Sequence, residues 1–200
     1  MPVAILQLED RFPADSQLFR DTRVVTTALP QRPELGLVLF GEQHLASLRA
    51  MLADEQVLRF SRVPVPVPDG FERAWLQSYQ GGRVDGTREA FAIAGERDEF
   101  LGVALAPDIN ASTRTVELGY LVAPEARGHG VATVALDQLT DWALSGLGAL
   151  RIELYISVDN AASKRVAQRC GYVPEGVLRS RHFKQDLRED TEIWSRLPGN

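Results

Sequence analysis

The feature that most restricts the fold is a strand-like segment that runs through a glycine-rich turn directly into a helix. Residues 113–122 (TRTVELGYLV) alternate in polarity, are rich in strand-forming side chains, and lead into Pro124. A turn that contains Arg127, Gly128 and Gly130 follows, and an amphipathic helical pattern begins at once. Glycines let a backbone approach a ligand closely, and the unpaired N–H groups in the first turn of a helix attract anions. The segment therefore predicts a site for a phosphate group.

Two other phosphate-binding loops do not fit this turn. No Gly-Lys-Ser/Thr sequence follows it, which excludes a Walker A loop. The stretch from Gly128 to Thr133 lacks the third glycine of a dinucleotide fingerprint and lies late in the chain instead of in a first βαβ unit. On these residues alone, a strand-to-helix turn without any ligand stays an alternative.

The rest of the chain alternates between strand-like and helical segments, which predicts an α/β fold with a mixed sheet. Asp69 is expected to cap a helix that Gly81 and Gly82 end. Val–Pro alternation at 63–68 predicts an extended loop. Strands are expected at 34–40, 90–96, 100–106, 113–122, 151–158, 172–179 and 190–197, and helices at 43–52, 71–79, 132–142 and 160–170.

Length and composition indicate one domain preceded by an arm. The chain has 200 residues, of which 44% are hydrophobic and 24% charged, as in ordinary globular proteins. Residues 1–33 mix charge with short apolar pieces and four prolines, so they are expected to be an N-terminal extension. Residues 34–200 are expected to form the folded domain.

Charge and cysteine content exclude several classes of partner and site. The 27 acidic residues outnumber the 22 basic residues, which argues against binding to duplex nucleic acid. No apolar run approaches the roughly 20 residues of a membrane span, and the first residues lack the basic region of a signal peptide. Cys170 is the only cysteine, so no internal disulfide and no metal site are expected. We expect a cytoplasmic protein without nucleic-acid or membrane partners.

Three motifs together carry a family resemblance. Residues 127–132 (RGHGVA) resemble the acetyl-CoA pyrophosphate loop of the GCN5-related N-acetyltransferases (GNAT). Residues 160–163 (NAAS) and 171–179 (GYVPEGVLR) resemble the RimJ/RimL-type branch of that superfamily. The resemblance implies a GNAT fold with a mixed, mostly antiparallel sheet of six to seven strands, a splayed central strand pair and about four flanking helices. It also implies an acetyl-CoA-dependent N-acetyltransferase that acts on a protein N-terminus or a small amine.

The resemblance also places the cofactor. Pantetheine is expected to lie where the strands at 113–122 and 151–158 splay apart, paired with strand backbone, and the pyrophosphate is expected on N–H groups of the turn. CoA would be the product. The residues implied for cofactor binding are Tyr120, Leu121, Val122, Arg127, Gly128, His129, Gly130, Val131, Ala132, Asn160 and Ser163.

The resemblance also implies catalytic residues, and this chain departs from the family at one of them. Many relatives place a general-acid tyrosine where this chain has Ala167, so Ser163 is the substitute that we expect. Ser163 also reads as an ordinary helix-capping residue. Two candidates compete for the base: Glu117 on the central strand and His182, which titrates near neutral pH and also reads as a solvent-facing loop residue. The oxyanion donor implied by the family is a strand N–H near Val122.

The acceptor amine and the rival functions stay open. A non-catalytic acyl-CoA-binding module and a regulatory partner that docks through residues 1–33 are the alternatives to an enzyme, and a homodimer is plausible. Acidic residues are expected to attract a cationic amine, namely Asp54, Glu55, Asp69 and Glu72. Aromatic candidates for the acceptor pocket are Phe60, Phe71, Trp75, Tyr79 and Phe183.

Overall fold

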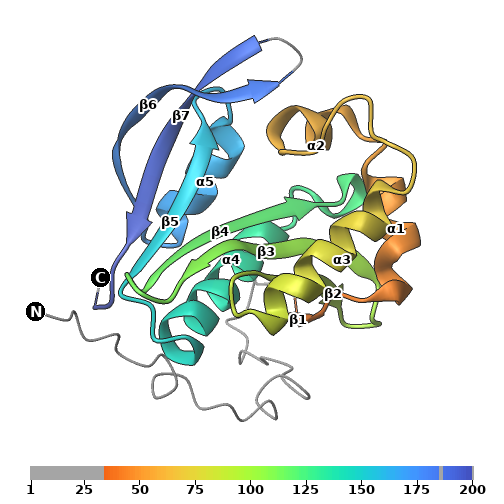
Figure 1. Cartoon of the computed structure of the whole chain (residues 1–200), viewed down its shortest axis with the longest axis horizontal. Coiled ribbons are helices and arrows are strands. Elements are labelled where there is room, and N and C mark those ends of the chain that lie inside the picture. The colour runs from red at the N-terminus through yellow and green to blue at the C-terminus, as the bar shows by residue number, and fades with distance from the viewer. Residues whose placement is uncertain (1–33, 185–186, 200) are drawn as a thin grey trace, which may run out of the picture.

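A seven-stranded sheet runs through the computed structural model, which describes residues 34–184 and 187–199 (Figure 1). The order of strands is β1-β2-β3-β4-β5-β7-β6, and every neighbouring pair is antiparallel except β4 and β5. The expected extension at residues 1–33 lies outside the described residues. The strands are β1 (Leu35–Leu39), β2 (Glu89–Gly95), β3 (Phe100–Asn110), β4 (Thr115–Val122), β5 (Arg151–Ser157), β6 (Val173–Lys184) and β7 (Leu187–Arg196).

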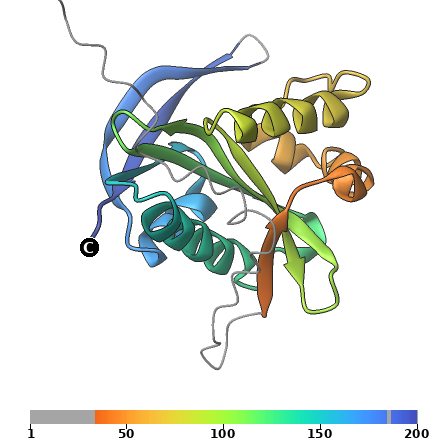
Figure 2. The same ribbon diagram turned by 60° about the horizontal axis from the view of Figure 1, so that its bottom comes forward.

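Helices cover both faces of the sheet (Figure 2). On one face, α4 packs against β1, β3 and β4, while α5 packs against β5 and α4. On the other face, α3 packs against β2 and also contacts α1. The mixed sheet with helices on both faces is the α/β architecture that the sequence predicts. The helices are α1 (Leu45–Met51), α2 (Glu55–Phe60), α3 (Phe71–Val84), α4 (Val131–Asp141) and α5 (Ala161–Arg169).

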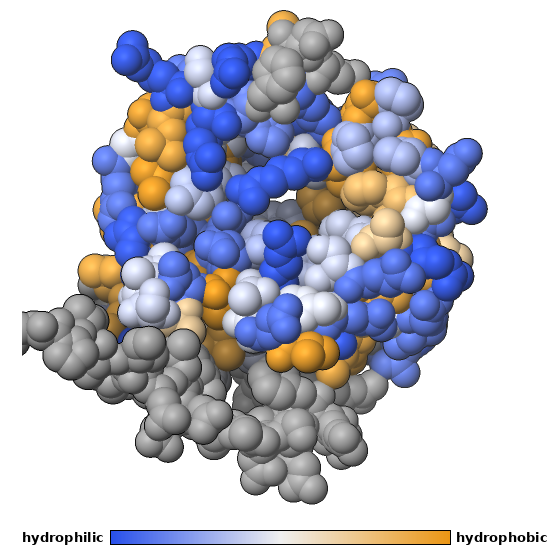
Figure 3. All heavy atoms as spheres, in the orientation of Figure 1, coloured by the Kyte–Doolittle hydropathy of each residue, from blue (hydrophilic) through white to orange (hydrophobic). Residues whose placement is uncertain are grey.

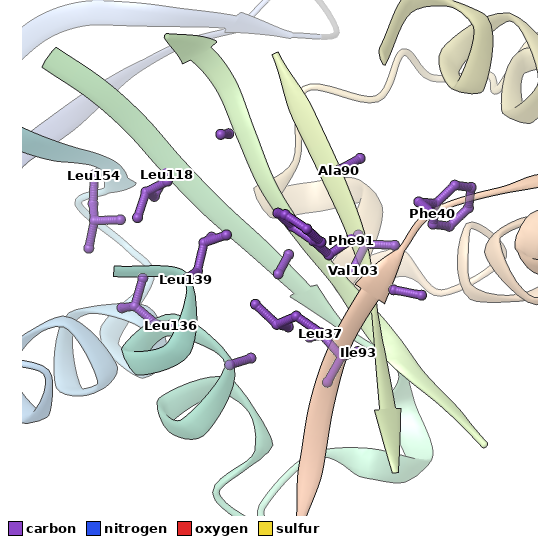
Figure 4. Packing of buried hydrophobic residues seen from close by; sticks show 14 of the residues in the cluster. Leu37, Phe40, Ala90, Phe91, Ile93, Val103, Leu118, Leu136, Leu139 and Leu154 are labelled. Atoms are coloured by element: carbon purple, nitrogen blue, oxygen red, sulfur yellow. The ribbon is translucent and has the colours of Figure 1, made fainter. Parts of the chain in front are cut away.

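The main core lies between the sheet and α4 (Figure 4). Leu136 and Leu139 of α4 are fully buried and lie on the same side of the sheet as Leu118 of β4. Full burial of one leucine stabilises a fold by about 1.5–3 kcal/mol relative to its exposure. Apolar spacing along residues 131–141 therefore fixes the helix on the sheet, and it fixes β4 and the turn before α4 relative to each other.

The two central strands part after a short paired stretch. Parallel pairing of β4 with β5 covers only Thr115–Glu117 against Arg151–Glu153. Beyond it, β4 continues to Val122 paired with β3 alone, and β5 continues to Ser157 paired with β7 alone. The splayed central pair expected from the family resemblance is thus present, and it opens one edge of each strand.

Two local expectations about helices are wrong. Gly81 and Gly82 lie inside α3, and Gly70, with φ of 73°, is the N-cap in place of Asp69. A Cβ atom on Gly82 would meet the Cβ of Arg88, so this glycine allows the following segment to fold back against the helix. The additional helix α2 begins after Asp54, whose carboxylate accepts a hydrogen bond of 2.8 Å from the N–H of Val57. It brings the total to five α-helices in the described residues, against about four expected.

We predict that Gly102→Ala destabilises the sheet next to the open edge. Gly102 has φ of 150°, and an added Cβ would collide with the carbonyl oxygen of Leu121 on β4. Strain and overpacking together should lower the free energy of unfolding by about 2–4 kcal/mol. Urea unfolding followed by circular dichroism measures it.

The matched control is Gly36→Ala on β1, where an added Cβ meets nothing within 4 Å. Its free energy of unfolding should stay within about 1 kcal/mol of that of the parent protein. Equal effects of the two substitutions would contradict the proposed close approach of β3 and β4.

Candidate active site

Two cavities meet where β4 and β5 part (Figure 3 shows the surface hollowed there, beside α2). The loop cavity, of about 360 Å³, lies between the glycine-rich turn, α2 and α5. The aromatic cavity, of about 420 Å³, lies on the other side and contains four of the five aromatic residues expected at an acceptor pocket: Phe60, Phe71, Trp75 and Tyr79. The side chain of the fifth, Phe183, is outside the described residues. Residues that line both cavities are Phe60, Tyr120, Leu121, Asn160 and Ser163.

The open edge of β4 presents backbone groups to these cavities. The N–H of Ala123 donates to the carbonyl of Leu101 at 2.9 Å, so this residue faces β3. Residues of an antiparallel ladder alternate in direction, so the N–H groups of Tyr120 and Val122 point to the open side. An extended ligand with amide groups could pair with this edge as an added strand does.

The turn before α4 holds five consecutive N–H groups without a partner in the described part of the chain, those of residues 128–132. Gly128 and Gly130 adopt left-handed conformations with φ of 81° and 79°, which turn the backbone into the start of the helix. The dipole of α4 adds partial positive charge at the same place. This arrangement is an anion cradle that opens into the loop cavity, and five of the expected cofactor residues form it.

The side chain of Arg127 serves a different contact from the one that its motif suggests. Its guanidinium binds Asp54 at 2.6 Å and also donates to Gln56 Oε1 at 3.2 Å and to the carbonyl of Val122 at 3.3 Å. The hydrogen bond from Arg127 holds the pKa of Asp54 below its usual range. Arg127 therefore ties the turn to the N-terminus of α2, so that α2 forms one wall of the loop cavity.

Asn160 caps α5, and the hydroxyl of Ser163 takes no part in that cap. The Asn160 Oδ1 atom accepts a hydrogen bond of 3.0 Å from the N–H of Ser163, which makes Asn160 the N-cap of α5. The Ser163 hydroxyl makes no hydrogen bond of normal geometry with any described residue. It lines both cavities, so it is available to a ligand at their junction.

Tyr120 brings a second hydroxyl to this junction. Its Oη atom is buried and has no hydrogen-bond partner of normal geometry among the described residues. Burial raises the pKa of Tyr120 to about 12, although the neighbouring Ser163 hydroxyl lowers it. A buried hydroxyl without a partner is costly, which indicates that a ligand or Ser163 satisfies it when the site is filled. The sequence predicts a role only for the backbone of Tyr120 and not for this hydroxyl.

Glu117 and His182 lie in different cavities. Glu117 lines the aromatic cavity together with Ser163, and its carboxylate binds Arg62 at 2.6 Å. Burial raises the pKa of Glu117, and the charge of Arg62 opposes that shift. His182 lines a third cavity, of about 280 Å³, which Arg62 also borders. Burial and the positive charges of Arg62 and Lys184 lower the pKa of His182.

The acidic residues expected around the acceptor are not there. Asp54 is bound by Arg127, and Glu72 pairs with Arg49 at 3.3 Å. Glu55 and Asp69 line none of the three cavities described. Of the carboxylates that the structure describes, only Glu117 borders the aromatic cavity. His129, the remaining residue of the motif, is exposed on the turn.

We predict that Arg62→Gln raises the pKa of Glu117 further. The variant removes the positive charge that favours the carboxylate and leaves the burial that disfavours it. Carbon-13 NMR titration of the glutamate carboxyls measures the change. Arg88→Gln is the control, because Arg88 borders the same cavity without pairing with Glu117. A pKa of Glu117 that falls or stays constant in Arg62→Gln would contradict the pairing.

The sequence is similar to those of known acetyltransferases. The sequence model of the "Acetyltransferase (GNAT) domain" family matches residues 34–173. The ribosomal-protein-serine acetyltransferase of Escherichia coli is 30% identical over 112 residues, which are 56% of this chain and 62% of that protein. The spermidine N(1)-acetyltransferase of Vibrio cholerae is 25% identical over 108 residues, which are 54% of this chain and 62% of that protein. The match therefore spans about three fifths of the length of these two curated relatives.

Solved structures show the same fold. RimL, a ribosomal L7/L12 alpha-N-protein acetyltransferase in complex with coenzyme A, aligns with a TM-score of 0.75 at 22% identity, over 84% of this chain and 96% of that one. Spermidine N-acetyltransferase from Vibrio cholerae in complex with CoA and spermine aligns with a TM-score of 0.73 at 20% identity, over 82% of this chain and 95% of that one. In the described residues, no helix is long and apolar enough to cross a membrane.

Proposed function

The chain belongs to the GNAT acetyltransferase family, and from this premise we propose that it transfers an acetyl group from acetyl-CoA to a primary amine. The family resemblance read from the motifs at 127–132, 160–163 and 171–179 is thereby confirmed. The observation that carries the proposed activity is the joining of two cavities at the open edge of β4, with an anion cradle at the end of one of them.

The described residues fit acetyl-CoA as the donor. The five free N–H groups of residues 128–132 suit a diphosphate, because they are positioned donors that need no charged side chain. The open edge at Tyr120 and Val122 suits the amides of pantetheine. The neighbouring hydroxyls of Tyr120 and Ser163, neither of which makes a hydrogen bond of normal geometry with a described residue, suit a polar group at the junction of the cavities. When bound, the donor supplies an acetyl thioester, whose acetyl carbon exchanges its bond to sulfur for a bond to the acceptor nitrogen.

We assign three tasks to residues of this chain. The N–H of Val122 is the hydrogen-bond donor for the oxyanion, because it points into the open edge and is held by the β3–β4 ladder. Ser163 delivers the proton that the departing sulfur needs, since its hydroxyl is not used in capping α5. Glu117 takes the proton that the acceptor nitrogen loses, because it shares the aromatic cavity with Ser163. His182, in the neighbouring cavity, is the alternative base.

A non-catalytic acyl-CoA-binding module is the second candidate function. Ala167, which is fully buried, stands where many relatives carry a tyrosine acid, and this departure favours the second candidate. Two features favour transfer: the aromatic cavity extends the site beyond the donor, and Tyr120 with Ser163 restores hydroxyl groups at the junction. The names of relatives include spermidine and a ribosomal protein as acceptors, so both a small amine and a protein N-terminus are considered for this chain.

We predict that Gly128→Asp weakens binding of CoA about tenfold or more relative to Gly128→Asn. Both side chains tolerate the left-handed conformation of Gly128, and they differ only in the charge that they place in the anion cradle. Isothermal titration calorimetry measures both affinities. Pantetheine, which lacks the diphosphate, should bind the two variants equally. If CoA binds both variants with the same affinity, the diphosphate does not occupy the cradle.

We predict that Ser163→Ala lowers kcat about 10- to 100-fold and leaves the KM for acetyl-CoA nearly unchanged, because a proton donor acts in the transition state. Release of the CoA thiol, detected by its exchange with a chromogenic aromatic disulfide, measures the rate. Lys164→Ala, one residue further along α5, is the control, because its amine binds Glu192 and the carbonyl of Val158 away from the junction. A normal kcat in Ser163→Ala would remove Ser163 from the mechanism.

A further inference from the structure

The acceptor side of the site is bordered by more positive than negative charge. The aromatic cavity and the third cavity adjoin, since both are lined by Phe60, Ser61, Arg62, Tyr155 and Ser157. Among the described residues, two carboxylates line this combined acceptor region, those of Glu117 and Glu189. Four guanidinium groups of the same described residues line it: Arg59, Arg62, Arg88 and Arg181.

Pairing within the protein neutralises only part of this charge. Arg62 binds Glu117 at 2.6 Å, and Arg59 binds Asp159 at 3.4 Å. Glu189 accepts a hydrogen bond of 3.4 Å from Ser157 and faces the positive charge of Lys184. Every carboxylate of the acceptor region therefore already has a polar or positive neighbour.

Arg88 and Arg181 have no carboxylate partner among the described residues. Arg88 donates a hydrogen bond of 3.0 Å to the hydroxyl of Ser78, and the guanidinium of Arg181 lies over the ring of Tyr155, 5.3 Å from its centroid. The two cations come from different elements, since Arg88 precedes β2 and Arg181 belongs to β6. Both are free to meet an anionic group that enters the acceptor region.

The same charges act on His182, which lines the third cavity. Burial is the main cause that lowers the pKa of His182, the charges of Arg62, Lys184 and Arg181 act in the same direction, and Glu189 opposes them. A second protonated amine in the same region would experience the same repulsion. A polyamine brings several such charges, whereas an acceptor with one amine and one anion brings no net charge.

Resting on the acetyl transfer proposed above, we propose that the natural acceptor is a primary amine that also carries a carboxylate or phosphate group, joined to the amine through an apolar or aromatic body. The anionic group binds Arg88 or Arg181, and the body packs among Phe71, Trp75 and Tyr155. The positive surroundings shift the acceptor ammonium toward the neutral amine, which is the form that attacks a thioester. Polyamines are poor acceptors for the same reason.

Matched acceptors test this inference. Glycyl-phenylalanine and glycyl-phenylalanine amide share one amine and one aromatic body and differ in the carboxylate. Glycyl-phosphotyrosine amide and glycyl-tyrosine amide form the corresponding phosphate pair, and spermidine represents polycations. We expect binding of the preferred anionic dipeptide about tenfold or more tighter than that of its neutral counterpart, with a difference that shrinks as salt is added. Spermidine should bind most weakly.

Binding is measured by calorimetry on the full chain saturated with CoA, so the result does not depend on turnover. Preference for the acid over the amide identifies a carboxylate as the recognised anion, and preference within the phosphate pair identifies a phosphate. Equal binding within both pairs, no detectable binding of any dipeptide, or tighter binding of spermidine would each overturn the inference. A measured anion preference without thiol release from acetyl-CoA would refute the transfer activity. The proposed class of ligand for this region, an amine that carries an anionic group, would still stand.

Arg88→Gln and Arg181→Gln locate the contact. Glutamine keeps the Cβ and Cγ atoms of Arg88 that lie against Gly82, so the charge is removed without opening the packing there. We expect one or both variants to reduce the anion preference about 3- to 10-fold. Arg73→Gln on α3 is the control, because its guanidinium pairs with Glu42 on the surface and borders none of the cavities. Preference that persists in both variants, or that falls equally in Arg73→Gln, contradicts a specific contact.

Discussion

The site depends on the early end of pairing between β4 and β5. Backbone amides in a sheet interior are ordinarily consumed by the neighbouring strand, and here the partner leaves after Glu117, so the N–H groups of Tyr120 and Val122 remain available. The β3–β4 ladder, together with core leucines such as Leu118 and Leu139, holds that edge rigid from the other side. The turn, α2 and α5 then enclose the opening, so cavities, cradle and hydroxyl groups all derive from one interrupted ladder.

Much of the fold and the donor side of the site could be predicted from the sequence, because both rest on local signals. Alternation at 151–158 and helical spacing at 132–142 report which faces are buried, and burial is what the sheet and α4 require. The glycines of the turn report a backbone conformation that only small residues adopt freely, and Gly128 and Gly130 do adopt it. Asn160 signalled the start of α5 through the ordinary chemistry of a helix cap.

Pairing between residues distant in the sequence could not be predicted in the same way. The sequence gives no sign that the guanidinium of Arg127 binds Asp54, 73 positions earlier. It also gives no sign that Glu72 pairs with Arg49, so two of the acidic residues expected to attract a cationic amine are engaged within the protein. The continuation of α3 through Gly81 and Gly82 could not be predicted, because Gly82 packs closely against Arg88 of the following segment and this contact leaves no mark in the sequence. The hydroxyl of Tyr120 gave no signal of its own, since a tyrosine in a strand most often belongs to the core.

The three-residue joint between β4 and β5 has a mechanical meaning. Strands β1–β4 form one part of the sheet and β5–β7 form another (Figure 1). The two parts are joined by the short pairing of Thr115–Glu117 on β4 with β5. An extended ligand along the free edge of β4 lies between the two parts of the sheet beyond this pairing, so it keeps them apart and also connects them. A ligand bound there therefore becomes a structural connection between two parts of the sheet that the strands themselves join only at Thr115–Glu117.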